Sequence, residues 1–189
     1  MRKLIVTEFL TLDGVYEEAT PWRQGYRTED STFKRDELFD AGALLLGRVT
    51  YEGFARYWPN ATETGAFGER MNHLPKFVAT TTLTDLSWNA TPLHGDVVEA
   101  VQTLKAQDGG HLLTYGSGTF VQTLLRHGLV DELRLMMYPV VLGSGKRLFG
   151  GGDRLTMQLA SSKELGDGVL LLTYVRDTEA RGDQVPSSQ

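Results

Sequence analysis

The strongest local signal for chemistry is the glycine-rich segment Tyr115-Gly116-Ser117-Gly118-Thr119, between a predicted strand and a predicted helix. Glycines lack a Cβ atom, so a ligand can approach the backbone closely, and free N–H groups at the start of the helix attract an anion. A phosphate or pyrophosphate suits such a turn, although a plain structural connection explains the segment equally well. The turn departs from the Rossmann dinucleotide fingerprint, because the third glycine position holds Val121.

A second glycine cluster, Gly143-Ser144-Gly145-Lys146-Arg147, lies closer to the end of the chain. A phosphate loop needs a leading glycine where this chain has Val140, and a Ser or Thr ligand for magnesium where it has Arg147. The sequence therefore argues against an ATPase.

Two other predicted strand ends carry groups that suit an anion. Gly47-Arg48-Val49-Thr50 places a guanidinium and a hydroxyl at the first turn of a helix, and Thr80-Thr81 offers hydroxyls after the next strand. Each has an ordinary alternative, since arginine is often a solvated surface charge and threonine is common at strand ends. Ligands of open α/β sheets bind at the carboxyl ends of strands, so the three segments together favour an extended phosphorylated ligand.

The hydrophobic pattern indicates alternating strands and helices that would position these groups. Residues 16–30 are predicted to form an irregular, lid-like loop, residues 59–73 a second loop, and Gly42 the end of a helix. Predicted strands cover residues 4–12, 43–46, 76–80, 111–115, 133–137, 155–160 and 169–175, and predicted helices cover about 30–39, 50–57, 97–104 and 120–127.

Early strands that alternate with helices imply a largely parallel sheet, and closely spaced late strands imply antiparallel additions at one edge. We therefore predict one α/β domain over residues 1–176, with a mixed, mostly parallel central sheet and helices on both faces. The polar segment 177–189 is predicted to be disordered. The late strands 133–138 and 169–175 are too apolar to leave an edge bare, which predicts a homodimer.

The composition excludes several classes of protein. No apolar stretch in the 189 residues is long enough to cross a bilayer, and the formal net charge of −5 argues against nucleic-acid binding. With no cysteine and four histidines without ligand-like spacing, no metal site is expected. The start of the chain has no signal-peptide pattern, so we expect a cytoplasmic protein.

In order, the segments at residues 11–14, 46–52, 80–81, 115–118 and 139–149 resemble the reductase domain of the bifunctional riboflavin-biosynthesis deaminase-reductase. That family belongs to the dihydrofolate-reductase superfamily, and the resemblance spans about residues 2–176. It implies a three-layer, dihydrofolate-reductase-like fold and an NADPH-dependent oxidoreductase that transfers a hydride from nicotinamide C4 to a small heterocycle-linked substrate. The implied substrate resembles that of 5-amino-6-(5-phosphoribosylamino)uracil reductase, a phosphoribosylamino-pyrimidine whose opened ribose is reduced.

The resemblance also assigns parts of the binding site. The Gly-Arg-x-Thr element and the paired threonines are implied to hold the adenosine and 2′-phosphate side of NADPH, and the glycine turn its pyrophosphate. Residues 142–145 are implied to close the substrate side. In full, it implies cofactor contacts from Val6, Gly47, Arg48, Thr50, Thr80, Thr81, Tyr115, Gly116, Ser117, Gly118 and Thr119, and substrate contacts from Asp13, Gly14, Leu142, Gly143 and Lys146.

Two departures limit this resemblance. The full riboflavin enzyme has a zinc deaminase half with cysteine ligands, which this chain lacks, so we expect a stand-alone reductase module. Dihydrofolate reductases hold the pterin with one acidic residue of the first helix, and here Asp30, Asp36 and Glu37 offer no clear register. Dihydrofolate or pterin reduction stays an alternative, as does a ligand-binding module without turnover.

The proton donor and the ligands of the substrate phosphate are less well defined. Asp13 is the candidate general acid, with a plain Asp-Gly turn as an equal alternative. Lys146, Arg147 or Arg23 would bind the phosphate, and the alternative for each is an exposed surface charge.

Overall fold

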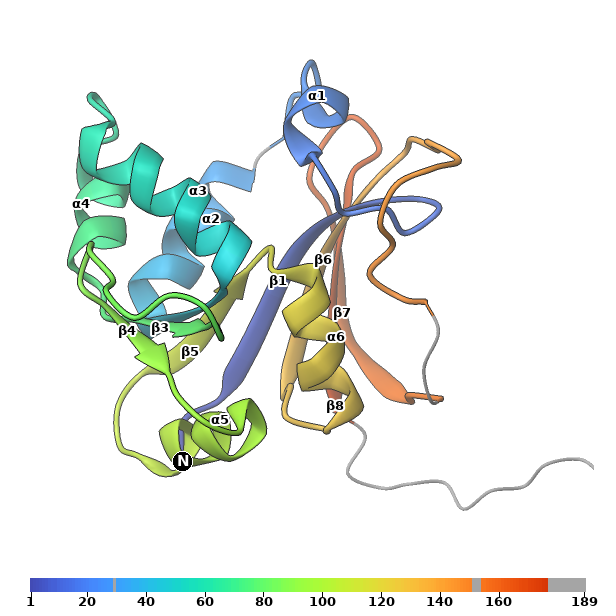
Figure 1. Ribbon diagram of the computed structural model, residues 1–189. Helices are drawn as coiled ribbons and strands as arrows, with labels where there is room; N and C mark the ends of the chain where they lie inside the picture. Colours follow the sequence, from blue (N-terminus) through green and yellow to red (C-terminus); the bar gives the residue numbers. More distant parts are fainter. Residues whose placement is uncertain (29, 151–153, 177–189) are drawn as a thin grey trace, which may run out of the picture.

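The computed structural model describes residues 1–28, 30–150 and 154–176. An eight-stranded sheet with the order β4-β3-β2-β5-β1-β6-β8-β7 runs through its centre (Figure 1). The strands from β4 to β6 are parallel, and β8 and β7 add an antiparallel edge. The strands are β1 (Leu4–Thr11), β2 (Ala41–Gly47), β3 (Lys76–Ala79), β4 (Ala90–Leu93), β5 (His111–Tyr115), β6 (Glu132–Tyr138), β7 (Met157–Glu164) and β8 (Leu170–Arg176).

Helices cover both faces of the sheet, which confirms the predicted three-layer architecture (Figure 1). On one face α5 and α6 bury Val101 and Leu124 against the sheet, and on the other α2 and α4 bury Leu38 and Met71. The helices are α1 (Ala19–Arg23), α2 (Asp30–Asp40), α3 (Arg48–Tyr57), α4 (Gly65–His73), α5 (Val97–Ala106) and α6 (Gly118–Arg126), with a 3-10 turn η1 (Trp58–Asn60).

Side-chain alternation along β1 divides the core. Val6 and Leu10 pack with α5 and α6, whereas Ile5 packs on the α2 side and Phe9 joins a third cluster around Tyr138. Because β1 lies inside the sheet with helices packed on both faces, its side chains are buried on both sides, and its near-continuous apolar sequence reflects that position.

Several predicted elements were wrong. The segment 59–73, predicted as a loop, contains α4. The glycines of α4 made the helical spacing of the apolar residues Phe67 and Met71 hard to recognise in the sequence. The lid segment 16–30 includes the short helix α1, and the edge strand β4 escaped prediction because it contains Pro92, which is tolerated at an edge. Gly42 does not end a helix, because α2 runs to Asp40 and β2 begins at the next residue.

The reason given for a dimer was also wrong. The apolar strands β6 and β8 are both interior, since β6 pairs with β1 and β8, and β8 pairs with β6 and β7. The true edge strand at this end, β7, is mostly polar and exposed. Among the described residues, the sheet therefore has no bare apolar edge at this end.

Within the described part of the chain, no helix is long and apolar enough to span a membrane. The tail predicted at 177–189 lies outside the described residues.

Gly42 provides a test of the fold. A Cβ atom at this position would lie 2.8 Å from the backbone of Gly110, so Gly42→Ala should force β2 and the start of β5 apart. We expect a loss of about 2 kcal/mol in the free energy of unfolding, measured by thermal denaturation. Gly53→Ala is the matched control, because Gly53 lies in α3 with nothing within 4 Å of a built Cβ, and alanine there should be neutral or stabilising. Equal melting temperatures for the two variants would contradict the packing described.

Candidate functional site

The sheet splits at the carboxyl end of β1. Pairing of β1 with β5 ends at Thr7 and Tyr115, whereas pairing with β6 continues to Thr11 and Tyr138. Residues 8–11 of β1 therefore have no strand partner on the β5 side. The carboxyl ends of β2, β3 and β5 reach the same edge of the sheet (Figure 1). This edge is where ligands of open α/β sheets bind.

Two of the predicted cofactor segments are joined by hydrogen bonds at this edge. The Gly47 N–H donates to Ser117 Oγ at 2.9 Å, and the Ser117 N–H donates to Thr50 Oγ1 at 3.0 Å. The starts of α3 and α6 are thereby held side by side. The hydroxyls of Thr50 and Ser117 form this link, so their first role is to shape the rim.

The remaining rim residues differ in their availability. Arg48 is 45% exposed and pairs with Glu52, four residues on, at 3.0 Å. An exposed pair at this spacing contributes about 0.5 kcal/mol or less, so a phosphate can replace the carboxylate at small cost. The Thr80 hydroxyl accepts hydrogen bonds from the N–H groups of Thr82 and Leu83 and shapes its own turn, while Thr81 is exposed.

At the start of α6, the side chain of Tyr16 explains why residue 118, which was assigned to cofactor binding from the sequence, is a glycine. A Cβ atom on Gly118 would lie 2.2 Å from Cζ of Tyr16, so only glycine fits beneath this ring. Tyr16 also donates its backbone N–H to the carbonyl of Lys146. The loop after β1 therefore packs onto the start of α6, and no side chain caps that helix. The sequence carried no signal for this contact.

Asp13 is a structural clamp between the loops after β1 and β6, and its role as proton donor stays a prediction. Its carboxylate accepts hydrogen bonds from Thr11 Oγ1 at 2.7 Å, from the Leu142 N–H at 3.2 Å and from the Gly143 N–H at 2.9 Å, and it pairs with Arg147 at 3.2 Å. These donors, Thr11 foremost, hold the pKa of Asp13 well below its usual range. The lowered pKa favours the ionised form, which accepts these hydrogen bonds.

Val6 contributes its side chain to the core, and its predicted contact with the cofactor stays a prediction. Its side chain is fully buried in the core beneath α6, and its backbone lies between Thr114 of β5 and Leu133 of β6. The first residue of β1 beyond the β5 pairing is Glu8, which is 4% exposed, and its Oε1 atom has no hydrogen-bond partner. Burial raises the pKa of Glu8 to about 8, although the nearby Lys34 opposes this shift. The predicted site did not include Glu8.

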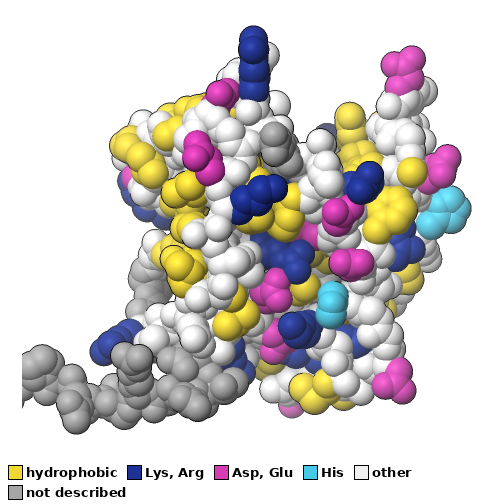
Figure 2. All heavy atoms as spheres, turned by 180° about the vertical axis from the view of Figure 1, so that it is seen from behind, with side chains coloured by type: hydrophobic (Ala, Val, Ile, Leu, Met, Phe, Trp, Pro, Cys, Tyr) yellow, Lys and Arg dark blue, Asp and Glu magenta, His cyan; other side chains and the backbone are white. Residues whose placement is uncertain are grey.

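On the opposite face, a second polar group that was not predicted lies between α2 and the sheet. Lys34 Nζ donates to Thr7 Oγ1 and to Glu37 Oε1, both at 2.7 Å, and Arg134 Nη1 lies 3.5 Å from Glu37 Oε2. Glu37 is thus a buried acidic residue of α2, while Asp36 is exposed. Charged side chains of both signs gather near the middle of this face (Figure 2). The spacing of Lys34 and Glu37, one helical turn apart, was the available signal.

Aromatic side chains continue this face toward α1. The rings of Phe9, Trp22 and Tyr26 meet Tyr138 edge-on, at centroid distances of 6.1, 5.5 and 5.2 Å. The guanidinium of Arg23 stacks on Phe9 with its Cζ atom 3.6 Å from the ring centroid. A flat group can therefore stack in this region.

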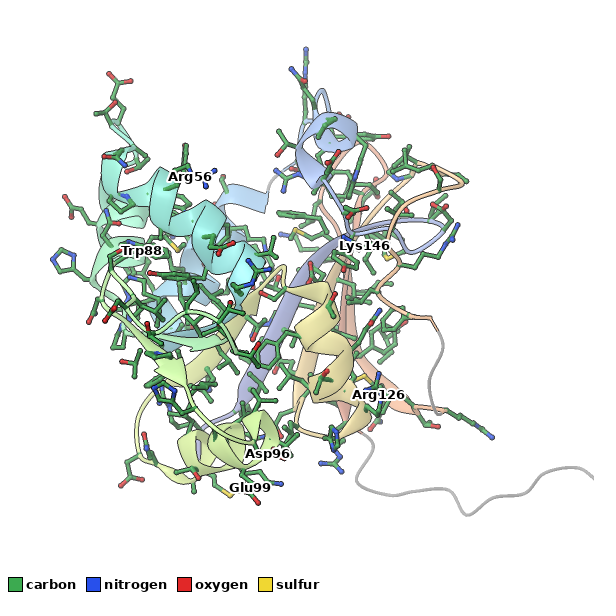
Figure 3. The ribbon with its side chains drawn as sticks, in the orientation of Figure 1. Arg56, Trp88, Asp96, Glu99, Arg126 and Lys146 are labelled. Atoms are coloured by element: carbon green, nitrogen blue, oxygen red, sulfur yellow. The ribbon has the colours of Figure 1, made fainter. Side chains whose placement is uncertain are left out.

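The predicted substrate residues lie around two cavities near the end of β1. Leu142 lines a cavity of about 430 Å³ with Trp22 of α1, and Asp13 and Gly14 line an apolar hollow of about 610 Å³ beside β6 and β8. Lys146 pairs with Glu17 at 2.6 Å, and Figure 3 shows it at the upper end of β1. Because Lys146 and Arg147 already pair with carboxylates of the 13–17 segment, they serve first to hold that segment.

The chain matches the RibD C-terminal domain family over residues 2–171 and belongs to that family of reductase-type domains. It is 27% identical to the uncharacterized protein YyaP of Bacillus subtilis (strain 168) over 177 residues, 92% of this chain and 94% of that protein. This confirms the predicted family.

Solved structures share the fold. A putative riboflavin biosynthesis protein from Shewanella sp. PV-4 superposes with a TM-score of 0.74 at 21% identity, covering 93% of this chain and 99% of that one. A pyrimidine reductase-like protein from Corynebacterium diphtheriae gives a TM-score of 0.66 at 14% identity, with 93% of each chain covered. RibD from Acinetobacter baumannii gives a TM-score of 0.64 at 17% identity, and the match covers 94% of this chain but 58% of that protein.

The clamp at Asp13 can be tested directly. Asp13→Asn removes the charge that the Leu142 and Gly143 amides donate to, so those two amides should exchange with deuterium about tenfold faster or more. In the wild type, protection should persist as the pH falls to about 4, because the pKa of Asp13 is lowered and the ionised form survives there. Asp85→Asn, at an exposed position, serves as the control. Unchanged exchange in Asp13→Asn would show that the carboxylate does not hold the loop.

Proposed function

We propose that the chain is an NADPH-dependent reductase that reduces a small heterocycle-linked substrate, in the manner of the pyrimidine reductases of riboflavin biosynthesis. The observation that carries this proposal is the rim in which Gly47, Thr50 and Ser117 are joined by hydrogen bonds beside the split in the sheet. The RibD reductase family is generally NADPH-dependent, which supports the choice of cofactor.

The residues at this edge fit such a cofactor. The N–H groups at the uncapped start of α6, beside the Tyr16 ring that packs on Gly118, would hold the pyrophosphate. The exposed Arg48 and Thr81 would hold the 2′-phosphate. Unpartnered polar atoms at Glu8 and Thr114 lie where β1 leaves β5, which suits a polar ring substituent. When bound, NADPH supplies the hydride, and the chain contributes orientation and exclusion of water.

The face between α2, β1 and β6 is the place we propose for the substrate. Its aromatic residues, which meet edge-on around Tyr138, suit a flat heterocycle, and the guanidinium of Arg23 lies over the Phe9 ring. A pterin is less well suited, because both oxygens of Glu37, the carboxylate that would hold it, already lie against cations, Oε1 against Lys34 and Oε2 against Arg134. We therefore favour a pyrimidine, in keeping with the pyrimidine reductase-like protein and the putative riboflavin biosynthesis protein that share the fold.

We further propose that the chain acts as a homodimer. Strands β6, β8 and β7 present apolar side chains around the 610 Å³ hollow, and Phe149 and Leu155 on its border are 50% and 47% exposed. A second copy of this face would cover them. The composition supports a cytoplasmic location, with a small molecule as substrate and neither nucleic acid nor membrane as a partner.

The role of Arg48 gives the most specific test of cofactor choice. Arg48→Ala should weaken NADPH binding by about 10- to 100-fold and leave NADH binding within about twofold, because only NADPH carries the 2′-phosphate. Calorimetric titration of both cofactors measures this difference. Arg56→Ala is the matched control, since Arg56 lies at the far end of the same helix (Figure 3), and its substitution should change neither affinity. Equal weakening of both cofactors by Arg48→Ala would refute the assignment.

The dimer is tested by sedimentation. Leu155→Glu places a charge in the apolar hollow and should shift the chain from dimer to monomer at micromolar concentration. Tyr57→Glu is the control, because Tyr57 is 58% exposed on α3, away from this face. A wild-type chain that sediments as a monomer would contradict the proposal.

A further inference from the structure

Glu8 occupies an unusual position for a carboxyl group. It is the first residue of β1 after the last β1–β5 pair, at Thr7 and Tyr115, so it stands where the sheet opens. Alternation along β1 places it on the face of Val6 and Leu10, which pack beneath α6. Only 4% of Glu8 is exposed, and its Oε1 atom makes no hydrogen bond.

A second unsatisfied polar atom lies beside it. Thr114 pairs with Val6 across β5 and β1, so Thr114 and Glu8 are diagonal neighbours on the same face of adjacent strands. Thr114 is fully buried, and its hydroxyl also lacks a hydrogen-bond partner. Buried polar atoms are almost always satisfied in folded proteins, so two orphans side by side at a break in the sheet require an explanation.

The chemistry of the pair defines what would satisfy it. A neutral carboxyl group donates one hydrogen bond through its O–H and accepts through its carbonyl oxygen. A primary carboxamide is complementary, because its oxygen accepts and its two N–H bonds donate. One N–H and the oxygen would meet Glu8, and the second N–H would meet the Thr114 hydroxyl.

We propose that Glu8 and Thr114 are positioning residues that bind the carboxamide of the nicotinamide ring. This inference rests on the proposed function, since it takes NADPH as the ligand of the split. Glu8 orients the ring through its substituent and takes no part in the transfer itself. In the cofactor-free protein, the two unsatisfied groups lower the free energy of unfolding. Binding of the carboxamide removes this destabilisation.

The groups around Glu8 keep it neutral. Lys34 of α2 is the charged group whose field reaches it, and this field favours the ionised form, but burial outweighs it and the pKa rises to about 8. The residues of β6 and α6 in the surrounding cluster, such as Leu135 and Val121, are apolar, and Tyr16 of the following loop packs against the same cluster. Below about pH 8 the carboxyl group therefore carries the proton it would share with the carboxamide.

The test compares stability with binding in the same variants. Glu8→Leu and Thr114→Val each remove an unsatisfied polar group, so the cofactor-free protein should melt about 3 °C higher or more. The same variants should bind NADPH about tenfold more weakly by calorimetry. Glu8→Gln should bind NADPH close to the wild-type level, because an amide keeps one donor and one acceptor. Glu69→Gln on the exposed surface of α4 is the matched control and should change neither quantity.

Two further readouts separate positioning from simple packing. The thermal advantage of Glu8→Leu over the wild type should grow between pH 5 and pH 8, because the raised folded-state pKa makes wild-type stability fall as the pH rises through that range. The 3-acetylpyridine analogue of NADPH lacks the carboxamide N–H groups. The wild type should bind this analogue about tenfold more weakly than NADPH, and Glu8→Leu should bind the two alike.

The outcomes distinguish the two proposals. If the wild type binds no NADPH, the proposed function itself fails. If the wild type binds NADPH, but Glu8→Leu and Thr114→Val bind it equally well and still discriminate against the analogue, the pair does not hold the carboxamide and this inference alone is overturned.

Discussion

The architecture of the site depends on where one strand pairing ends. β1 leaves β5 after Thr7 but stays with β6 for four more residues, and this difference opens the parallel sheet at its centre. The backbone of residues 8–11 is thereby free on one side, in a region otherwise covered by helices. The rim segments lie along the edge that contains this opening, because the parallel strands that carry them end at the same edge.

Electrostatics then divides the charged residues into two groups. Asp13, Lys146 and Arg147 bind one another or their neighbours, so their charges hold the loops after β1 and β6 together. Among the described residues, Arg48 pairs only with the exposed Glu52, which leaves it available to an anion at little cost. The carboxyl of Glu8 is kept neutral by burial. The site therefore combines loops held by ion pairs, a cation at Arg48 that can bind an anion, and a buried acid at Glu8 without a hydrogen-bond partner. These features suit a site that positions its ligands.

The sequence predicted the fold class and three rim segments because both leave local patterns, namely alternating apolar strands and glycine or threonine at strand ends. It did not predict α4, whose apolar stripe is short, or the clamp at Asp13, whose amide donors Leu142 and Gly143 lie about 130 residues away in the chain. Glu8 was missed for a related reason. A single acid in an apolar strand has no local signature, and its burial depends on α6 and on the end of β5.

The central claim is that one dinucleotide bridges the rim and the split. It is tested most directly by titrating the isotope-labelled protein with NADPH and following backbone amide resonances. The account predicts shifts in residues 47–50, 80–81 and 116–119 together with residues 8–10 of β1, all saturating at one concentration. Shifts confined to the apolar hollow on β6 and β8, or separate saturation of the rim and of β1, would contradict it.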